Sequence, residues 1–276
     1  MKNKMQILIY LLFIFTTFSF LNAQQTLKGT SNDSPIEIFA EDGIEWHKSK
    51  NKYIARGNAK AKKGDLLVKS KILEATYRDS EGNKENGEIE LIKAIGNVFI
   101  ENNNATITGG EKASFNVEKE HFIVNGKQLI LISDKDKLTS NRTIEFWKIE
   151  NIAIATGNAK AYKDKKYRIK ADKLVWHLTD SKKKKEYEIK KILAFKNVII
   201  ETNNEIAYSD KALYNELSGI CKLFGNVKLK KGGSYLTGEY AEMNLNSGIS
   251  KLLPHPKNDS FGNEGRVKAL IKKDEQ

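Results

Sequence analysis

The heptad "ARGNAKA" at Ala55–Ala61 returns one hundred residues later as "ATGNAKA" at Ala155–Ala161. Neither copy contains a side chain suited to catalysis, so the repeat points to architecture. Each heptad's glycine is followed thirty-nine residues later by a related phrase, "GNVFIENNN" from Gly96 and "KNVIIETNN" from Lys196. A fifth copy, "GNVKLKKG", begins at Gly225. A period of roughly 30–40 residues is typical of stacked supersecondary units that cannot bury their apolar faces alone.

Apolar and polar residues alternate through most of the chain. "DLLVKS" places Leu66 and Val68 on one face, and "NVFIEN" does the same with Val98 and Ile100. This period of two is typical of half-buried strands, and no helical period is sustained anywhere. Prolines stand only at positions 35, 254 and 256, so the span between the first two has every backbone donor that a sheet needs. The sequence predicts an all-β fold.

The Gly-Asn pairs suggest how each unit begins. Both residue types tolerate the positive φ of a tight turn, so we expect each pair to reverse the chain into a new strand. Each unit would then be a hairpin or a little more, which is too short for the four strands of a propeller blade. We therefore predict an elongated sandwich or folded sheet.

A second phrase, of the form small-acidic-lysine-apolar, follows the Gly-Asn starts, as in "ADKLVWH" from Ala171. The apolar phase changes across it, because Ile169 lies in one phase whereas Leu174 and Trp176 lie in the other. A bulge or corner at Asp172-Lys173 would keep both sets facing inward. The alternative is that these two residues end one strand and begin the next.

The first residues predict a signal peptide, residues 1–23. Lys2 and Lys4 precede the apolar run Ile7–Leu21, and Ala23 suits the last position before a cleavage site. An uncleaved membrane anchor is the alternative, although the run has 15 residues and a spanning helix needs ~20.

Composition and charge narrow the function classes. At 39% hydrophobic and 30% charged, the chain is globular and long enough to bury a core. The net charge of +12 falls to about +10 without Lys2 and Lys4, which favours anionic partners such as phosphorylated lipid. The alternative explanation of the positive charge is a lysine-rich solvated surface that arises from compositional bias. Cys221 is the only cysteine, so no internal disulfide can form, and we expect it to be a core residue.

We expect no catalytic site, no metal and no cofactor. "ATITGGEKAS" lacks the full phosphate-loop pattern. The histidines lack the spacing of metal ligands and stand at His47, His121, His177 and His255. The lysine run at Lys182–Lys191 has no interleaved aromatics for base stacking. It reads as a solvated hairpin tip, with contact to lipid phosphates as the next interpretation, and nucleic acid is not an expected partner.

The ordered motifs resemble the LptA/OstA family, which carries lipopolysaccharide from the inner to the outer membrane of Gram-negative envelopes. The resemblance rests on "PIEIFAEDGIEW" at Pro35–Trp46, the Gly-Asn starts, the acid-lysine phrases and the ending "SGISKLLPHPKNDSFGNEGRVKALI". It covers residues 24–276 as two similar halves, 35–134 and 135–276, with hydrophilic insertions at "RDSEGNKENGE" and "TDSKKKKEYE".

The resemblance implies an elongated, V-shaped β-jellyroll of two folded antiparallel sheets, located in the periplasm. Its apolar interior would hold the acyl chains of lipid A, each buried methylene contributing about 0.8 kcal/mol. Ordinary core packing is the alternative role for every candidate. The candidate lipid-binding residues are Ile36, Ile38, Leu66, Val68, Val98, Ile100, Phe115, Ile169, Trp176, Val198, Ile200, Tyr214, Val227 and Leu229.

The resemblance also implies partners. Strand addition at the sheet edges Pro35–Phe39 and Arg266–Ile271 would join the protein to an LptC-like inner-membrane anchor, an LptD-like outer-membrane assembly protein, or further copies head to tail. Two other functions stay open. The chain could be a membrane-anchored LptC-like component of the same pathway, or an exported β-protein that binds anionic polymer through surface charge.

Overall fold

The computed structural model describes residues 36–80, 83–103, 105–133, 136–163, 167–181, 186–254 and 267–271. Contacts divide the chain into Met1–Ser34 and Pro35–Gln276, and all described residues lie in the second unit. The predicted signal peptide, residues 1–23, lies outside the described residues.

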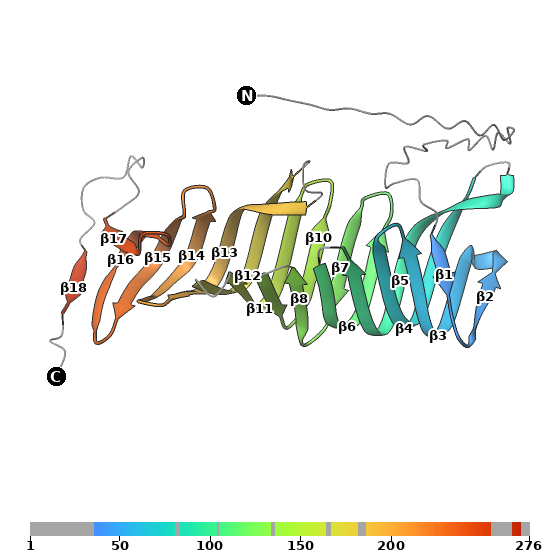
Figure 1. Ribbon diagram of the computed structural model, residues 1–276, viewed down its shortest axis with the longest axis horizontal. Helices are drawn as coiled ribbons and strands as arrows, with labels where there is room; N and C mark the ends of the chain where they lie inside the picture. Colours follow the sequence, from blue (N-terminus) through green and yellow to red (C-terminus); the bar gives the residue numbers. More distant parts are fainter. Residues whose placement is uncertain are drawn as a thin grey trace, which may run out of the picture. The chain divides into compact units, whose positions relative to one another are not determined.

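The described part of the chain consists almost entirely of strands in a single sheet, and most long strands pair with the next long strand in the sequence (Figure 1). Every pairing in this sheet is antiparallel, as in β3 with β4. A short 3-10 helix, η1, covers Lys48–Lys50. The strands are β1 (Glu37–Phe39), β2 (Gly43–His47), β3 (Lys52–Lys63), β4 (Leu66–Ser80), β5 (Asn83–Asn102), β6 (Ala105–Asn116), β7 (His121–Asn125), β8 (Leu129–Ser133), β9 (Asp136–Ser140), β10 (Thr143–Trp147), β11 (Ile152–Lys163), β12 (Tyr167–Ser181), β13 (Glu186–Thr202), β14 (Ile206–Asn215), β15 (Ile220–Lys231), β16 (Ser234–Asn244), β17 (Ile249–Leu253) and β18 (Lys268–Leu270).

The sheet forms two layers because each long strand belongs to both. Residues 52–56 of β3 pair with β2, whereas residues 60–62 pair with β1. At the other end, residues 240–244 of β16 pair with β17 and residues 235–237 with β18. We call the layer that contains β2, β7, β10 and β17 the first layer, and the layer that contains β1, β8, β9 and β18 the second layer. The predicted all-β, jellyroll-like fold is confirmed.

The Gly-Asn pairs form the corners between the two layers, and the prediction that they reverse the chain is wrong. Gly57 and Asn58 do have positive φ, at 75° and 40°, but they lie inside β3. The strand segments on either side of them pair with the same neighbour, β4, and the register shifts between Arg56 and Ala59. The pair is therefore a bulge that bends a continuous strand, because a reversal would require the two segments to pair with each other.

The acid-lysine phrase also bends a continuous strand. β12 runs unbroken through Asp172, and its register against β13 shifts between Lys170 and Lys173. Ile169 and Leu174 lie in opposite phases, yet both are buried. Of the predicted bulge or corner, the corner is confirmed, and the alternative of a strand break is excluded. The extra residue of the register shift lies in β13, because Lys170 pairs with Ile199 and Lys173 with Phe195.

The predicted division at residues 134 and 135 falls between β8 and β9, outside the described residues. β8 pairs with β9, and β7 pairs with β10, so the ladder continues past this point in both layers. β3 and β11 each have 12 residues and β4 and β12 each have 15, as expected of two similar halves. The division into halves stays a prediction about sequence repeats.

The hydrophilic insertions lengthen the hairpins that join β4 to β5 and β12 to β13. Residues 81–82 and 182–185, which separate these strands in the sequence, lie outside the described residues. The predicted solvated tip at Lys182–Lys191 therefore falls partly outside them and partly in β13.

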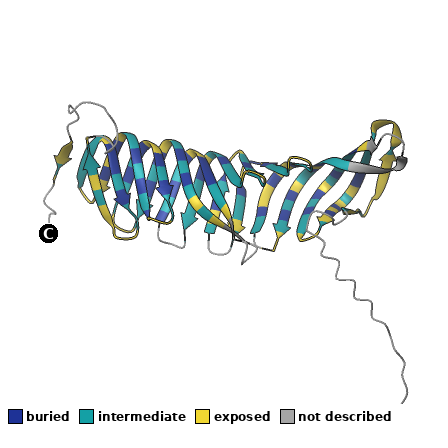
Figure 2. Cartoon of the chain, turned by 90° about the horizontal axis from the view of Figure 1, so that it is seen from above, coloured by how far each residue is buried: buried dark blue, intermediate teal, exposed yellow. Residues whose placement is uncertain are grey.

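Buried residues recur from strand to strand along the whole described sheet (Figure 2). Cys221 is among them, and burial raises the pKa of its thiol to about 12. The prediction that it is a core residue is confirmed.

Candidate functional site

The structure brings all fourteen candidate residues into one apolar interior between the two layers. Ile36, Ile38, Leu66 and Phe115 are partly buried against this interior. The other ten are buried: Val68, Val98, Ile100, Ile169, Trp176, Val198, Ile200, Tyr214, Val227 and Leu229. Burial is expected of residues in a packed core and of residues in a lipid-binding groove alike, so the lipid contacts of these residues stay a prediction.

Small residues mark the narrow side of the interior, next to the corners. Ala155 pairs with Leu174, which pairs with Ala194, so alanine and leucine alternate across neighbouring strands. Ala55 and Leu73 repeat the pattern in the first half. A small side chain such as that of alanine fits where two layers converge, and an alternation of small and large side chains fills such a space well. Sequence reasoning missed this row, although alanine recurs two residues before four of the five corner pairs.

Larger side chains stand at the rim of the interior, away from the corners. In the first half, a small apolar pocket of about 20 Å³ lies at this rim. Leu66 and Val68 line it from the second layer, and Ile92 and Phe115 line it from the first. Residues of both layers thus face the same space. The remaining lining residues are Ile36, Ala61, Lys62 and Lys63.

In the second half, two tyrosines meet at the rim. The rings of Tyr167, in the second layer, and Tyr214, in the first, lie 5.3 Å apart with an interplanar angle of 61°. Both side chains are buried, and this burial raises the pKa of each hydroxyl. Beside them, the Lys163 ammonium donates a hydrogen bond of 2.9 Å to Asp136 and lies 4.0 Å from a carboxylate oxygen of Glu216.

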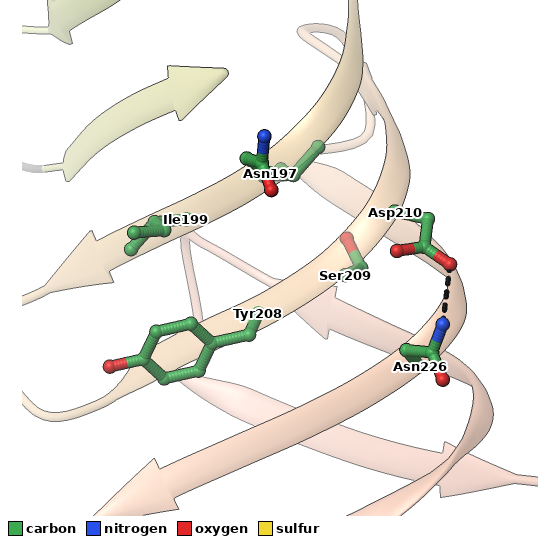
Figure 3. Close-up of a pocket in the computed structure, with 7 residues that line it drawn as sticks. Asn197, Ile199, Tyr208, Ser209, Asp210 and Asn226 are labelled. Atoms are coloured by element: carbon green, nitrogen blue, oxygen red, sulfur yellow. Dashed lines mark hydrogen bonds between the residues drawn. The ribbon is translucent and has the colours of Figure 1, made fainter. Parts of the chain in front are cut away.

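A larger hollow, of about 240 Å³, lies at the corners of β13, β14 and β15 (Figure 3). Polar side chains line much of it, including Asn197, Ser209, Asp210 and Asn226. Asn226 donates a hydrogen bond of 2.7 Å to Asp210 across it. Val198 is the one predicted candidate among its lining residues. Four of its seven lining residues carry polar or charged side chains, and it lies at the corners, so the apolar interior remains the candidate site.

The described residues contain no group of three or more His, Cys, Asp or Glu side chains placed to hold a metal ion. Of the predicted histidines, His121 stacks on Trp147 with ring centroids 3.6 Å apart, and His47 contacts Glu45 at 2.7 Å. His255 lies outside the described residues. Within the described part of the chain, no helix has the length and apolar character to cross a bilayer.

The fold and the site together define an all-β, jellyroll-like protein with a continuous apolar interior. Residues 137–249, from β9 to β17, match the family model described as "LptA/(LptD N-terminal domain) LPS transport protein". The resemblance to LptA/OstA proteins is confirmed over these residues, which are similar to this family of LPS transport proteins. The match is to a transport family and not to an enzyme family, in agreement with the sequence interpretation.

Comparison with solved structures finds the crystal structure of LptH, "the LptA homologous periplasmic component of the conserved lipopolysaccharide transport device from Pseudomonas aeruginosa". The alignment covers 89% of this chain and 100% of that chain at 11% identity, with a TM-score of 0.23. A TM-score this low carries no argument about the fold. No curated protein sequence matches the chain.

Proposed function

We propose that the protein is a periplasmic carrier that binds lipopolysaccharide with the acyl chains of lipid A between its two layers. The carrying observation is the single apolar interior, to which the strands from β3 to β16 contribute and in which all fourteen candidates lie. A lipid with several acyl chains exposes a large apolar area, and burying that area is worth about 25 cal/mol per Å². The family match over residues 137–249 supports lipopolysaccharide as the cargo.

The two layers have to separate when lipid enters, because the interior is filled by its own side chains. The rim pocket in the first half holds about 20 Å³, roughly the room that one water molecule needs and far too little for an acyl chain. Strand ladders within each layer do not oppose this movement, since the layers are joined through the corners. The corners therefore act as the hinge, and the rim is where lipid enters.

The protein also bridges the two membranes in this proposal, through its edge strands. Among the described strands, β1 and β2 pair with β3 alone, and β17 and β18 pair with β16 alone. Each end therefore offers one free edge per layer. Apolar residues are exposed at both ends, with Trp46 51% exposed and Ile249 58% exposed. Unpaired edges with exposed apolar side chains favour strand addition by a partner.

The predicted edges correspond to β1 and β18, although Pro35 and Arg266 themselves lie outside the described residues. An LptC-like anchor at one end and an LptD-like assembly protein at the other would continue both layers. A second copy of this chain is an equivalent partner, and such a head-to-tail contact does not close on itself.

Fluorescent lipopolysaccharide and the purified protein test the carrier function, with the salt concentration raised from about 0.05 to about 0.5 M, because charge pairing is screened across this range. Burial of acyl chains is not weakened by salt, so we expect binding to persist and to be competed by lipid A but not by its sugars. Loss of binding at high salt would leave the lysine-rich exterior as the contact and would overturn the proposal.

A further inference from the structure

The two halves differ at the rim, and strand register identifies the equivalent residues. Leu66 pairs with Lys63, and Tyr167 pairs with Lys163, so Leu66 and Tyr167 occupy equivalent places. Phe115 pairs with Ile92, and Tyr214 pairs with Ile192, so Phe115 and Tyr214 are equivalent as well. An apolar pair in the first half thus stands where a tyrosine pair stands in the second.

The acidic residues beside the tyrosines also have apolar equivalents. The backbone N–H of Glu216 donates to the carbonyl oxygen of Lys190, and the backbone N–H of Val117 donates to the carbonyl oxygen of Glu90. Val117 is therefore the first-half equivalent of Glu216. Asp136 pairs with Lys163. When the register of β1, in which Glu37 pairs with Lys62, is continued by one residue, Ile36 comes to lie opposite Lys63. Ile36 is therefore the first-half equivalent of Asp136.

The second half is held shut across its rim. Tyr167 and Tyr214 join the layers by their edge-on ring contact, and Lys163 lies between carboxylates of both layers, Asp136 and Glu216. We call these five residues the clasp. The interior behind it is closed, since Ile200 is 0% exposed and Ile192 is 3% exposed.

The first half has the same lysine without the clasp. Its rim pocket is lined by Ile36, Leu66 and Phe115, with Lys62 and Lys63 as the charged lining residues and no carboxylate among the lining residues. The interior behind it is less closed, since Ile100 is 5% exposed and Ile92 is 8% exposed. A lining of apolar side chains beside two cations fits an acyl chain attached to a phosphorylated headgroup.

We infer that acyl chains enter and bind at the first-half rim, with Lys62 and Lys63 facing the headgroup phosphates, while the clasp keeps the second half closed. This inference rests on the proposed carrier function and assigns the site within it. Separation of the layers is easier where the clasp is missing, so the first half opens and the clasped half remains a packed core.

Photo-crosslinking at matched positions tests this assignment. Benzoylphenylalanine is placed at Phe115 in one variant of the full chain and at Tyr214 in another, and each is irradiated with purified lipopolysaccharide. We expect the adduct at position 115 to exceed that at position 214 by about tenfold or more, which corresponds to a clear difference in occupancy. Equal adducts, an excess at position 214, or no adduct at either position would overturn the inference.

Exchange variants provide a second test with a built-in control. Leu66→Tyr/Phe115→Tyr transfers the tyrosines to the first half, and we expect it to weaken lipopolysaccharide binding by about tenfold. Tyr167→Leu/Tyr214→Phe is the reverse exchange. We expect it to strengthen lipopolysaccharide binding, because it removes the ring contact that holds the second half closed, and unchanged binding would contradict the role of the clasp. Weaker binding by the reverse exchange alone would place the lipid in the second half. Circular dichroism checks that each variant folds, and the crosslinking comparison decides if one does not.

These outcomes separate the inference from the carrier function. Salt-resistant binding with equal crosslinks in both halves would retain the carrier and reject the site. Binding that disappears at high salt would reject the carrier itself.

Discussion

The side-chain amide of Asn226 donates a hydrogen bond of 2.7 Å to Asp210 on the neighbouring strand. Asn197 makes the corresponding contact with Asp172 at 3.1 Å. Each asparagine comes from a corner pair and each aspartate from an acid-lysine phrase. The two phrases that repeat along the sequence are therefore partners in space, and their contact fixes one bent strand against the next.

This contact predicts a specific cost for adding one methyl group at the corner. Gly225 has φ of 73°, and a Cβ there would lie 2.7 Å from Asp210 Oδ2. We expect Gly225→Ala to lower the free energy of unfolding by about 1–2 kcal/mol for the backbone, and by about 1 kcal/mol more because Asp210 must release Asn226. Urea denaturation measures the loss.

Gly248→Ala is the matched control for this corner. Gly248 has φ of 69°, but its Cβ would meet nothing within 4 Å. Gly248→Ala should therefore lower the free energy of unfolding by the backbone contribution alone. Equal losses for the two variants would show that the contact between Asn226 and Asp210 adds nothing to stability.

Truncation of interior residues should affect the two halves differently. Ile200→Ala removes a fully buried side chain and should lower the free energy of unfolding by about 2–5 kcal/mol. Leu66→Ala removes a partly buried side chain and should cost less stability but more lipopolysaccharide binding. Thermal unfolding and binding of fluorescent lipopolysaccharide, measured on both variants, check this. A greater binding loss for Ile200→Ala would contradict the assignment of the first half as the site.

Exposed apolar residues at the edges should promote association. Ile249 lies on the edge strand β17 and is 58% exposed, so Ile249→Asp should leave stability within about 0.5 kcal/mol while reducing self-association. Sedimentation velocity at increasing protein concentration measures this. Leu217→Asp is the control, since Leu217 is 98% exposed in the turn between β14 and β15. If both variants dissociate alike, general surface hydrophobicity and not the edge drives association.

Burial of Cys221 predicts a loss of stability in alkali. Its thiol has a pKa of about 12 in the fold against 9.0 for an ordinary cysteine thiol, so only the unfolded chain releases this proton between those values. Stability should fall with rising pH through this window by about 1.4 kcal/mol per pH unit from this group, and should be unaffected by it below pH 9. Denaturation of the protein and of Cys221→Ala at pH 8 and pH 10.5 measures the difference. The same pH dependence in both would show that the thiol contributes nothing.

The sequence predicted those features that depend on local pattern. Alternation identified the inward-facing residues, and the phase change between Ile169 and Leu174 located a corner. The sequence alone could not show that Gly57-Asn58 bends a strand, because a positive φ is compatible with a bulge and with a chain reversal equally well. Only the pairing of both flanking segments with β4 separates them.

The difference between the halves depends on contacts that are distant in the sequence. Tyr167 and Tyr214 are separated by most of two hairpins, and their meeting requires the register of β12, β13 and β14 together. The second edge strand at each end, β2 and β17, was missed for a related reason. At each end, a corner divides the terminal segment into two edge strands, one in each layer. The alternation of apolar and polar residues within one strand does not indicate this division.

The corners also explain how such a chain can change in length. β11 receives β9 and β10 in the same way that β3 receives β1 and β2. A duplicated block that starts and stops at these equivalent junctions would insert itself in register and leave both ends able to accept the same neighbours. The length of such a sheet is therefore adjustable by duplication, in steps set by the repeat and without redesign of either end.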